Sequence, residues 1–159
     1  MSTRSYFLFL ILALVGMQSC KAPDLNVFER NVAIPAQSWS YHFLPSVDFN
    51  VSDTIASYNV LVVCRHTEAY AYKNLWVLLD TRKPGEIKTQ KERFELTLQD
   101  NTGRWYGTGM DDIWEQRIPL YQNLHFDKPG VYTVTFEQNM RDEPLKGILD
   151  IGLRVEKAP

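Results

Sequence analysis

Apolar and polar residues alternate along most of this chain with the period of a β-strand. Such alternation predicts strands that bury one face and expose the other. The predicted strands are residues 27–32, 39–45, 47–51, 55–65, 75–79, 87–98, 131–138 and 149–156. No stretch shows the period of a helix. The pattern therefore predicts an all-β protein, with a single antiparallel β-sandwich of the jelly-roll type.

Four of these segments carry further information. Residues 55–65 are apolar on both faces near the centre, which predicts an interior strand. Residues 75–79 are wholly apolar and predict a short buried strand. Residues 118–121 include Pro119 and predict an irregular segment or a sheet edge, because proline has no N–H to donate to a neighbouring strand. Residues 27–32 precede Pro35 and predict a short edge strand.

The first twenty residues have the pattern of an export signal. Arg4 precedes an uncharged apolar run, residues 6–15, that is too short to span a bilayer. Gly16-Met17-Gln18-Ser19-Cys20 resembles a bacterial lipobox, in which the signal is cleaved before the cysteine, and the cysteine then receives a diacylglycerol and an acyl chain such as palmitate. The other interpretation is an ordinary secretory signal that leaves Cys20 free. Lys21 is unlike an inner-membrane retention aspartate, which favours the outer membrane.

These features divide the chain into three parts. We expect a lipoprotein signal peptide at residues 1–19, a lipidated N-terminus and tether at 20–38, and one β-sandwich domain at 39–159. Cys64 lies in an apolar run, so we expect a small buried residue without a disulfide partner. The net charge of −2 argues against nucleic-acid binding, which needs a basic face.

The stretch from Gly103 to Trp114 places three glycines among large aromatic residues and contains two adjacent carboxylates. We take it, with one later tyrosine, as a candidate partner or ligand surface made of Trp105, Tyr106, Asp111, Asp112, Trp114 and Tyr121. If exposed, the aromatic side chains would form a stacking platform for a sugar or a hot spot for a protein. If buried, they would close one end of the sandwich.

No residue pattern in the chain defines a reaction. Asp111 and Asp112 could bind calcium together with Glu115, although capping of a short helix that begins near Asp112 is favoured. The histidines His42, His66 and His125 lack the spacing of a zinc site, and no serine lies in a nucleophile motif. The sequence predicts a protein that is not an enzyme and that has no cofactor and no metal.

Several blocks of the sequence resemble the GldH family of gliding-motility lipoproteins from Bacteroidota. The blocks are Asn74-Leu75-Trp76, Gly103-Arg104-Trp105-Tyr106-Gly107-Thr108-Gly109 followed by Asp112-Ile113, Pro129-Gly130-Val131-Tyr132, Gln138-Asn139-Met140-Arg141 and residues 145–157, in the order of the family. The lipobox at Cys20 also fits. The resemblance covers most of the mature chain and is strongest from Leu75 onward.

The resemblance implies a cell-envelope lipoprotein needed for gliding and for the associated type IX secretion machinery. It implies partners among other envelope lipoproteins and motor or secretion components, and it implies no catalytic residues. The lipid on Cys20 would attach the protein to the membrane, and we expect the outer membrane, facing the periplasm. The alternative function is a periplasmic glycan- or peptidoglycan-binding module that uses the aromatic residues of the candidate surface.

Overall fold

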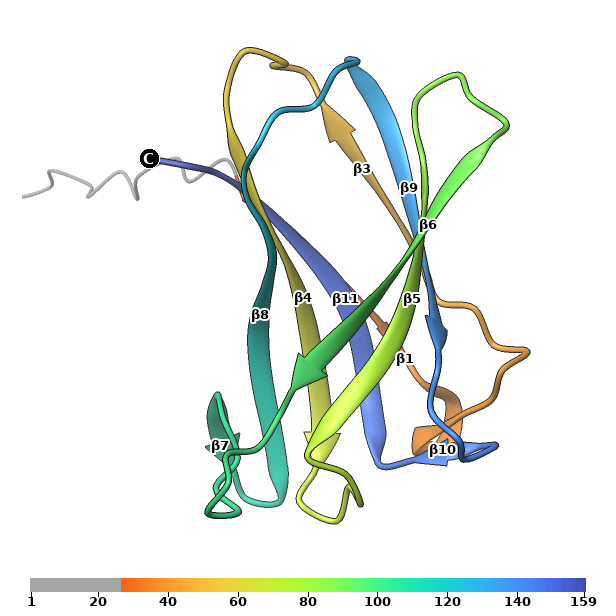
Figure 1. Cartoon of the computed structure of the whole chain (residues 1–159), viewed down its shortest axis with the longest axis vertical. Helices are drawn as coiled ribbons and strands as arrows, with labels where there is room; N and C mark the ends of the chain where they lie inside the picture. The colour runs from red at the N-terminus through yellow and green to blue at the C-terminus, as the bar shows by residue number, and fades with distance from the viewer. Residues whose placement is uncertain (1–26) are drawn as a thin grey trace, which may run out of the picture.

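The computed structural model describes residues 27–159 and forms a β-sandwich of antiparallel sheets (Figure 1). Cys20 lies outside the described residues, together with the predicted signal peptide. The long strands are β1 (Val27–Ala33), β3 (Ser46–Val51), β4 (Tyr58–Thr67), β5 (Asn74–Arg82), β6 (Thr89–Thr97), β8 (Ile113–Leu124), β9 (Gly130–Gln138) and β11 (Ile148–Lys157). The short elements are the 3-10 helix η1 (Pro35–Gln37) and the strands β2 (Ser38–Trp39), β7 (Thr108–Met110) and β10 (Leu145–Lys146).

The long strands pair as nested hairpins. Strand β1 pairs with β11, β3 with β9, β4 with β8, and β5 with β6. This long hairpin rolls up into two sheets, with the orders β1-β11-β4-β8-β7 and β3-β9-β5-β6, while β2 and β10 form a small separate pair. The arrangement is the jelly-roll topology. It confirms the antiparallel sandwich that the alternating pattern predicted.

The core between the sheets is built from alternate residues of each strand. In β3, Val47, Phe49 and Val51 are buried and the residues between them are exposed. Strand β4 lies between β11 and β8, as predicted for an interior strand. Cys64 of β4 is a free thiol within this core, and burial raises its pKa to about 12. It therefore acts as a small apolar residue.

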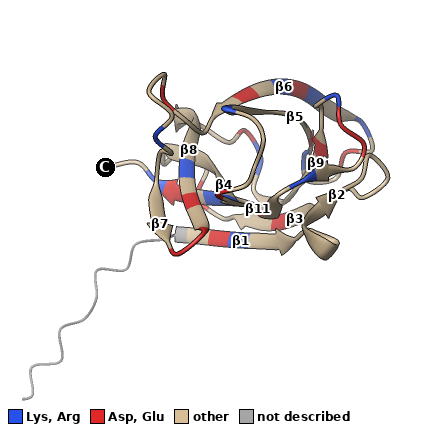
Figure 2. Cartoon of the chain, turned by 90° about the horizontal axis from the view of Figure 1, so that it is seen from below, with Lys and Arg blue, Asp and Glu red and all other residues tan. Residues whose placement is uncertain are grey.

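The topology places each loop at one of the two ends of the sandwich. The upper end in Figure 1 carries the end of β11, the start of β1 that pairs with it, and the loops at 52–57, 83–88 and 125–129. The lower end carries the loops at 34–45, 68–73, 98–112 and 139–147. Figure 2 views the molecule from this lower end and shows acidic and basic residues alternating along β6. The glycine-rich stretch and residues 139–147 thus share one end, although they are distant in sequence.

The strand predicted for residues 39–45 is wrong. Strand β2 ends at Trp39, and the chain then turns, with the Phe43 N–H donating to the Ser40 carbonyl at 3.0 Å. The indole N–H of Trp39 donates to the Phe43 carbonyl at 2.9 Å and closes the turn. The alternation in this segment therefore comes from a turn that buries Trp39 and exposes Tyr41.

Residues 118–121 lie at a sheet edge, which is one of the two alternatives predicted, because β7 pairs with β8 only at residues 113–115. They are a regular part of β8, where Pro119 pairs with Leu61 beside a register shift. A second local prediction is wrong. The helix expected near Asp112 is instead the turn of the β7–β8 hairpin, with Asp111 in the left-handed region at φ 54°.

The N-terminal part of the sandwich begins inside the range expected to be a tether. Strand β1 forms the edge of the five-stranded sheet and pairs with β11 from Val27 to Ala33. Residues 27–38 therefore belong to the folded sandwich. Within residues 27–159, no helix is long and apolar enough to cross a membrane.

Candidate functional site

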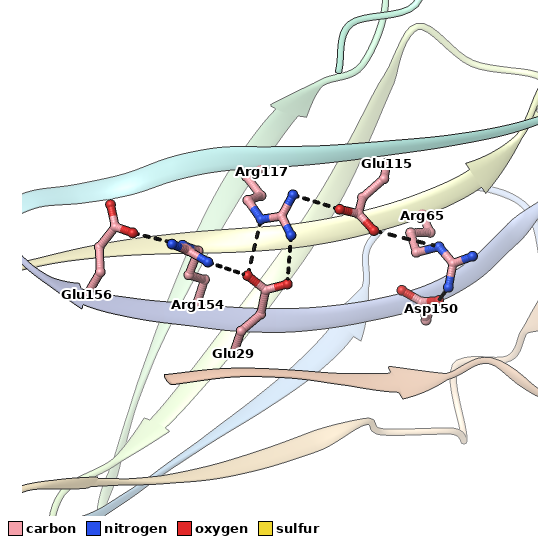
Figure 3. Close-up of polar contacts among 7 residues, drawn as sticks. All are labelled: Glu29, Arg65, Glu115, Arg117, Asp150, Arg154 and Glu156. Carbon is pink, nitrogen blue, oxygen red and sulfur yellow. Dashed lines mark hydrogen bonds and ion pairs between the residues drawn. The ribbon is translucent and has the colours of Figure 1, made fainter. Parts of the chain in front are cut away.

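The outer face of the five-stranded sheet carries a continuous network of ion pairs (Figure 3). The members are Glu29, Arg65, Glu115, Arg117, Asp150, Arg154 and Glu156, from strands β1, β4, β8 and β11. Each arginine contacts two carboxylates of the set. The charges are thus paired within the molecule, and none of the three arginines in this network is free to bind a ligand.

The outer face of the four-stranded sheet differs, because it holds a hollow bordered by arginines without carboxylate partners. The hollow has a volume of about 490 Å³ and is lined by Tyr72, Trp76, Arg93, Asn139, Met140 and Arg141. We call it the Trp76 groove. Among the described residues, neither Arg93 nor Arg141 forms an ion pair. Two exposed cations beside half-buried aromatic side chains make this groove the strongest candidate site.

Trp76 occupies the groove because of the register of β5. Its neighbours Leu75 and Val77 are fully buried in the core, so Trp76 between them points to the outer face. On β6, the Arg93 guanidinium carbon lies 4.0 Å from the centre of the Trp76 ring system, within the range of a cation–π contact. This contact positions a planar cation above a large apolar surface.

The segment after β9 forms the opposite wall and is held at several points. The Asn139 N–H donates to the Trp76 carbonyl at 2.8 Å, and the Trp76 N–H donates to the Met140 sulfur at 3.2 Å. Gln138 is buried, and its side chain accepts from the Met140 N–H at 2.9 Å and donates to the Asp142 carbonyl at 3.0 Å. The wall is therefore fixed by hydrogen bonds before any ligand arrives.

Long-range contacts anchor the same segment to the loop after β2. The Tyr41 hydroxyl donates to the Met140 carbonyl at 2.6 Å. The Glu143 carboxylate accepts from the Ser40 hydroxyl at 2.6 Å and from the Tyr41 N–H at 2.8 Å. These bonds, above all the one from Ser40, lower the pKa of Glu143 and keep it ionised.

Tyr72 closes the groove from the loop between β4 and β5. Its hydroxyl donates to the Asp142 carboxylate at 2.7 Å, a bond that raises the pKa of the phenol. The arrangement holds a neutral tyrosine, an amide and two guanidinium groups around aromatic surface. Such a set can bind an anionic group through the arginines while an apolar or planar part of the ligand rests on Trp76.

The residues predicted from the glycine-rich stretch lie elsewhere, at the lower end of the sandwich. The Trp105 ring packs against His66 with centroids 4.5 Å apart and also faces Tyr70 at 6.5 Å. Trp114 lies opposite His66 in the β4–β8 register and is half-buried. Trp105 and Trp114 thus help to close this end of the sandwich around a buried histidine, which is the second of the two roles considered for them.

The other predicted site residues do not join Trp105 and Trp114 in one surface. The Tyr121 hydroxyl donates to Glu92 at 2.9 Å, and its ring packs edge-on against Phe94, farther up β8. Tyr106 is 40% exposed at the lower end. Asp111 and Asp112 are exposed in the β7–β8 turn. Arg104, from the same stretch, pairs with Asp100 at 3.3 Å.

The glycines of this stretch allow the backbone of the β7–β8 hairpin to pack closely. Gly107 has φ of +84°, and a Cβ there would lie 2.1 Å from the Glu115 carbonyl oxygen. A Cβ on Gly109 would lie 3.0 Å from the Trp114 ring. The spacing Gly107-Thr108-Gly109 is therefore explained by close packing against β8.

The part of the chain that the structure describes contains no group of three or more histidine, cysteine or acidic side chains arranged to hold a metal. Glu115, considered as a calcium ligand with Asp111 and Asp112, is engaged by Arg117 and Arg65 in the ion network. Burial lowers the pKa of His66, whose Nδ1 lies 2.9 Å from the Thr67 carbonyl. The ring is therefore neutral and donates that bond.

Sequence reasoning missed the Trp76 groove for identifiable reasons. Residues 75–79 appeared wholly buried because the run is apolar throughout, yet Trp76 lies on the outer face. Arg93 and Arg141 come from segments far apart in sequence. The usable signal was that two blocks of the family resemblance, Asn74-Leu75-Trp76 and Gln138-Asn139-Met140-Arg141, each contribute to the groove.

The fold and the groove define an antiparallel β-sandwich with a preformed polar and aromatic hollow, and the comparisons give its family. The sequence model described as GldH lipoprotein matches residues 26–155. The chain therefore belongs to the GldH lipoprotein family.

Two curated relatives agree over nearly the full length. "Gliding motility lipoprotein GldH homolog" of Christiangramia forsetii is 27% identical over 164 aligned residues, which cover 99% of this chain and 98% of the relative. "Gliding motility lipoprotein GldH" of Flavobacterium johnsoniae is 26% identical over 155, which cover 93% and 94%. No solved structure matches this chain. These relatives support a gliding-motility lipoprotein, as the resemblance implied.

Proposed function

We propose that this lipoprotein is a non-catalytic assembly component of the gliding-motility and type IX secretion machinery. In this proposal it docks onto other envelope proteins through the Trp76 groove. The observation that carries the proposal is the pair of arginines without carboxylate partners, Arg93 and Arg141, beside a preformed aromatic wall. Arginine and tryptophan are the residues most enriched at the energetic centres of protein interfaces.

The proposal includes the position of the protein in the cell. Signal cleavage after residue 19 would leave Cys20 to carry the diacylglycerol and an acyl chain such as palmitate. A tether of residues 20–26 would then join the lipid to β1. Lys21 supports retention at the outer membrane, with the sandwich facing the periplasm.

The choice of a protein partner rests on the chemistry of the groove. Arginine binds carboxylates through two parallel hydrogen bonds, and an acidic segment of a partner presents such groups beside apolar side chains. No nucleophile is placed beside a base among the lining residues, so the groove is better suited to binding than to catalysis.

A glycan is the second candidate ligand, and Trp76 with Tyr72 gives it a specific basis. A sugar ring can stack on the part of the Trp76 indole that remains exposed, and uronic or peptidoglycan carboxylates could reach Arg93 or Arg141. The platform first considered, with Trp105, Tyr106, Trp114 and Tyr121, is less suitable because Tyr121 packs against Phe94 and Glu92, away from Trp105 beside His66.

The test is charge reversal at the groove. We expect Arg93→Glu and Arg141→Glu to abolish surface spreading and export of secretion cargo while leaving the protein folded and in the membrane fraction. Both side chains are exposed, so folding should be unaffected. Arg30→Glu is the matched control, since Arg30 is also exposed and without an ion pair among the described residues.

Crosslinking in intact envelopes separates the two ligands. A photoreactive amino acid at Asn139 should crosslink to a protein in the parent chain and lose that product in the charge-reversal variants. Normal spreading of both variants would contradict the docking role of the groove. A product that peptidoglycan hydrolases degrade would instead favour the glycan.

A further inference from the structure

The upper end of the sandwich presents the most exposed large hydrophobic side chains of the described chain. Ile55, in the loop after β3, is 90% exposed, and Ile87, in the loop after β5, is 99% exposed. Val131, at the start of β9 near the same end, is 54% exposed. The nested pairing brings these positions to one end together with Val27. Two isoleucines that expose nearly all of their side-chain surface, on separate loops at the same end, could both meet one extended apolar surface.

Both isoleucines lie on loops that are held in place by hydrogen bonds and ion pairs to neighbouring residues. Asp53 accepts from the backbone N–H groups of Ile55 and Ala56 at 3.0 and 3.1 Å, and its other oxygen accepts from Lys157 at 2.8 Å. The Tyr58 hydroxyl donates to the Asp53 carbonyl at 2.8 Å. The loop therefore holds Ile55 outward without needing a partner to order it.

The loop of Ile87 is held in the same manner. Lys83 pairs with Asp127 at 2.7 Å, and Lys128 pairs with Glu86. The Glu86 N–H donates to the Lys83 carbonyl at 3.1 Å in a turn. These pairs neutralise most charges around Ile87, so little free charge must be removed from water when this end meets an apolar surface.

The length of the chain before β1 limits which end of the sandwich can face the membrane that holds the anchor. Six residues lie between Cys20 and Val27, so seven residue-to-residue steps reach at most about 25 Å when fully extended. Strand β11 has ten residues and is about 33 Å long. A sandwich standing on its lower end would hold Val27 farther from the membrane than the tether reaches. The lower end therefore cannot face the membrane end-on.

We propose that the upper end of the sandwich rests on the phospholipid membrane that holds the Cys20 lipid, with Ile55 and Ile87 inserted among the acyl chains near the headgroups. This inference rests on the lipid anchor of the proposed function. Lys88, next to Ile87 and without an ion pair among the described residues, would reach up to the lipid phosphates. The lower end, with the loops around the Trp76 groove, then faces away from the membrane toward other proteins.

The experiment places a fluorescent probe at the end proposed to touch lipid. Ile55→Cys, Ile87→Cys and, at the lower end, Met110→Cys are made in the full chain that carries the Cys20 lipid. Met110 is the matched control because it is 76% exposed and belongs to β7. Each cysteine receives an environment-sensitive dye, and the proteins are reconstituted into phosphatidylethanolamine vesicles that contain a lipid with a nitroxide near the headgroup. The parent chain controls for labelling at Cys64, which is buried.

We expect the probes at positions 55 and 87 to emit at shorter wavelength and to lose most of their fluorescence to the nitroxide lipid, and the probe at 110 to change in neither respect. Equal quenching at all three positions, or none at 55 and 87, would overturn the proposal. Probes at 55 and 87 that are shielded from water in native envelopes but not in vesicles would indicate contact with a protein. That result would also overturn the proposal.

Fractionation separates this inference from the function on which it rests. A chain found in the membrane fraction, with unquenched probes at 55 and 87, keeps the anchor and removes the membrane-facing orientation. A chain found in the soluble fraction removes the anchor and the orientation together. Loss of spreading in the Arg93→Glu variant reports only on the groove.

Discussion

Arg117 of β8 binds Glu29 of β1 across the two strands that lie between them. The guanidinium approaches the carboxylate through Nη2 and Oε1 at 2.9 Å and through Nε and Oε2 at 3.1 Å. Three strand spacings separate the two backbones by about 14 Å. The pair spans Val63 and Gly152, which are buried although they face outward from the sandwich. A polar network therefore covers the sheet where another protein would use an apolar layer.

The first prediction concerns the contact between Arg117 and Glu29 over this sheet. Arg117→Gln should lower the free energy of unfolding by about 1 kcal/mol, because it removes the two-bond contact with Glu29 and uncovers Val63, while water screens an arginine that is 44% exposed. Urea denaturation measures the change. Arg104→Gln removes an exposed pair with Asp100 and should cost about 0.3 kcal/mol or less. Equal losses in the two variants would show that the Arg117 contact has no special role.

The second prediction is the pH dependence of the same contact. The Arg117 hydrogen bonds lower the pKa of Glu29 below its usual value of 4.5, against the effect of burial. A carboxyl with a lowered pKa in the folded state stabilises the protein above pH 4.5, and this contribution is lost as the pH falls through the folded-state value. Asp150 changes the stability of the folded protein with pH in the opposite direction, because burial raises its pKa.

Comparison with Glu29→Gln isolates the Glu29 contribution. Urea midpoints measured from pH 7 to pH 3 should differ by a constant amount above about pH 5, and the difference should shrink toward pH 3. Asp150 is common to both chains and cancels. A difference that grows on acidification would contradict the assigned sign.

Much of the fold could be predicted from alternation, because strands of a sandwich bury one side. The interior position of β4 followed from Val62 and Val63, which are apolar on opposite faces. The turn after Trp39 could not be predicted, because Glu143, the residue that holds it, lies more than 100 positions away. Pro119 indicated a sheet edge correctly. Among the described strands, the outer edge of β8 has no partner beyond Glu115, so a residue without an N–H is tolerated there.

The candidate site was less predictable than the fold. Aromatic residues close together in sequence, Trp105 and Trp114, indicated a surface, but both help to close the lower end around His66. The groove instead combines Trp76, Arg93 and Arg141 from three separate segments. Which residues meet across a jelly roll depends on nested long-range pairing, and local pattern carries no information about that.

The third prediction tests why Gly107 is required. Gly107→Ala should destabilise the protein by more than about 2 kcal/mol, because the new methyl would strike the Glu115 carbonyl in addition to straining a left-handed backbone. Gly103→Ala is the matched control. Gly103 has φ of +89° with open space around it, so only the strain of about 1 kcal/mol applies. Similar losses at the two positions, measured by thermal and urea unfolding, would remove the steric explanation.

The fourth prediction concerns Cys64, the second of two cysteines in the chain. Burial among apolar neighbours raises its pKa to about 12, so hardly any thiolate exists at neutral pH, and the side chain is closed to reagents. In the lipidated protein, a thiol reagent should give no modification of the folded chain and one modified cysteine in urea. The urea concentration at which labelling begins should match the unfolding transition followed by tryptophan fluorescence. Labelling of the folded protein at neutral pH would show that β4 opens locally, and that the inner face of this strand is less closed than its packing implies.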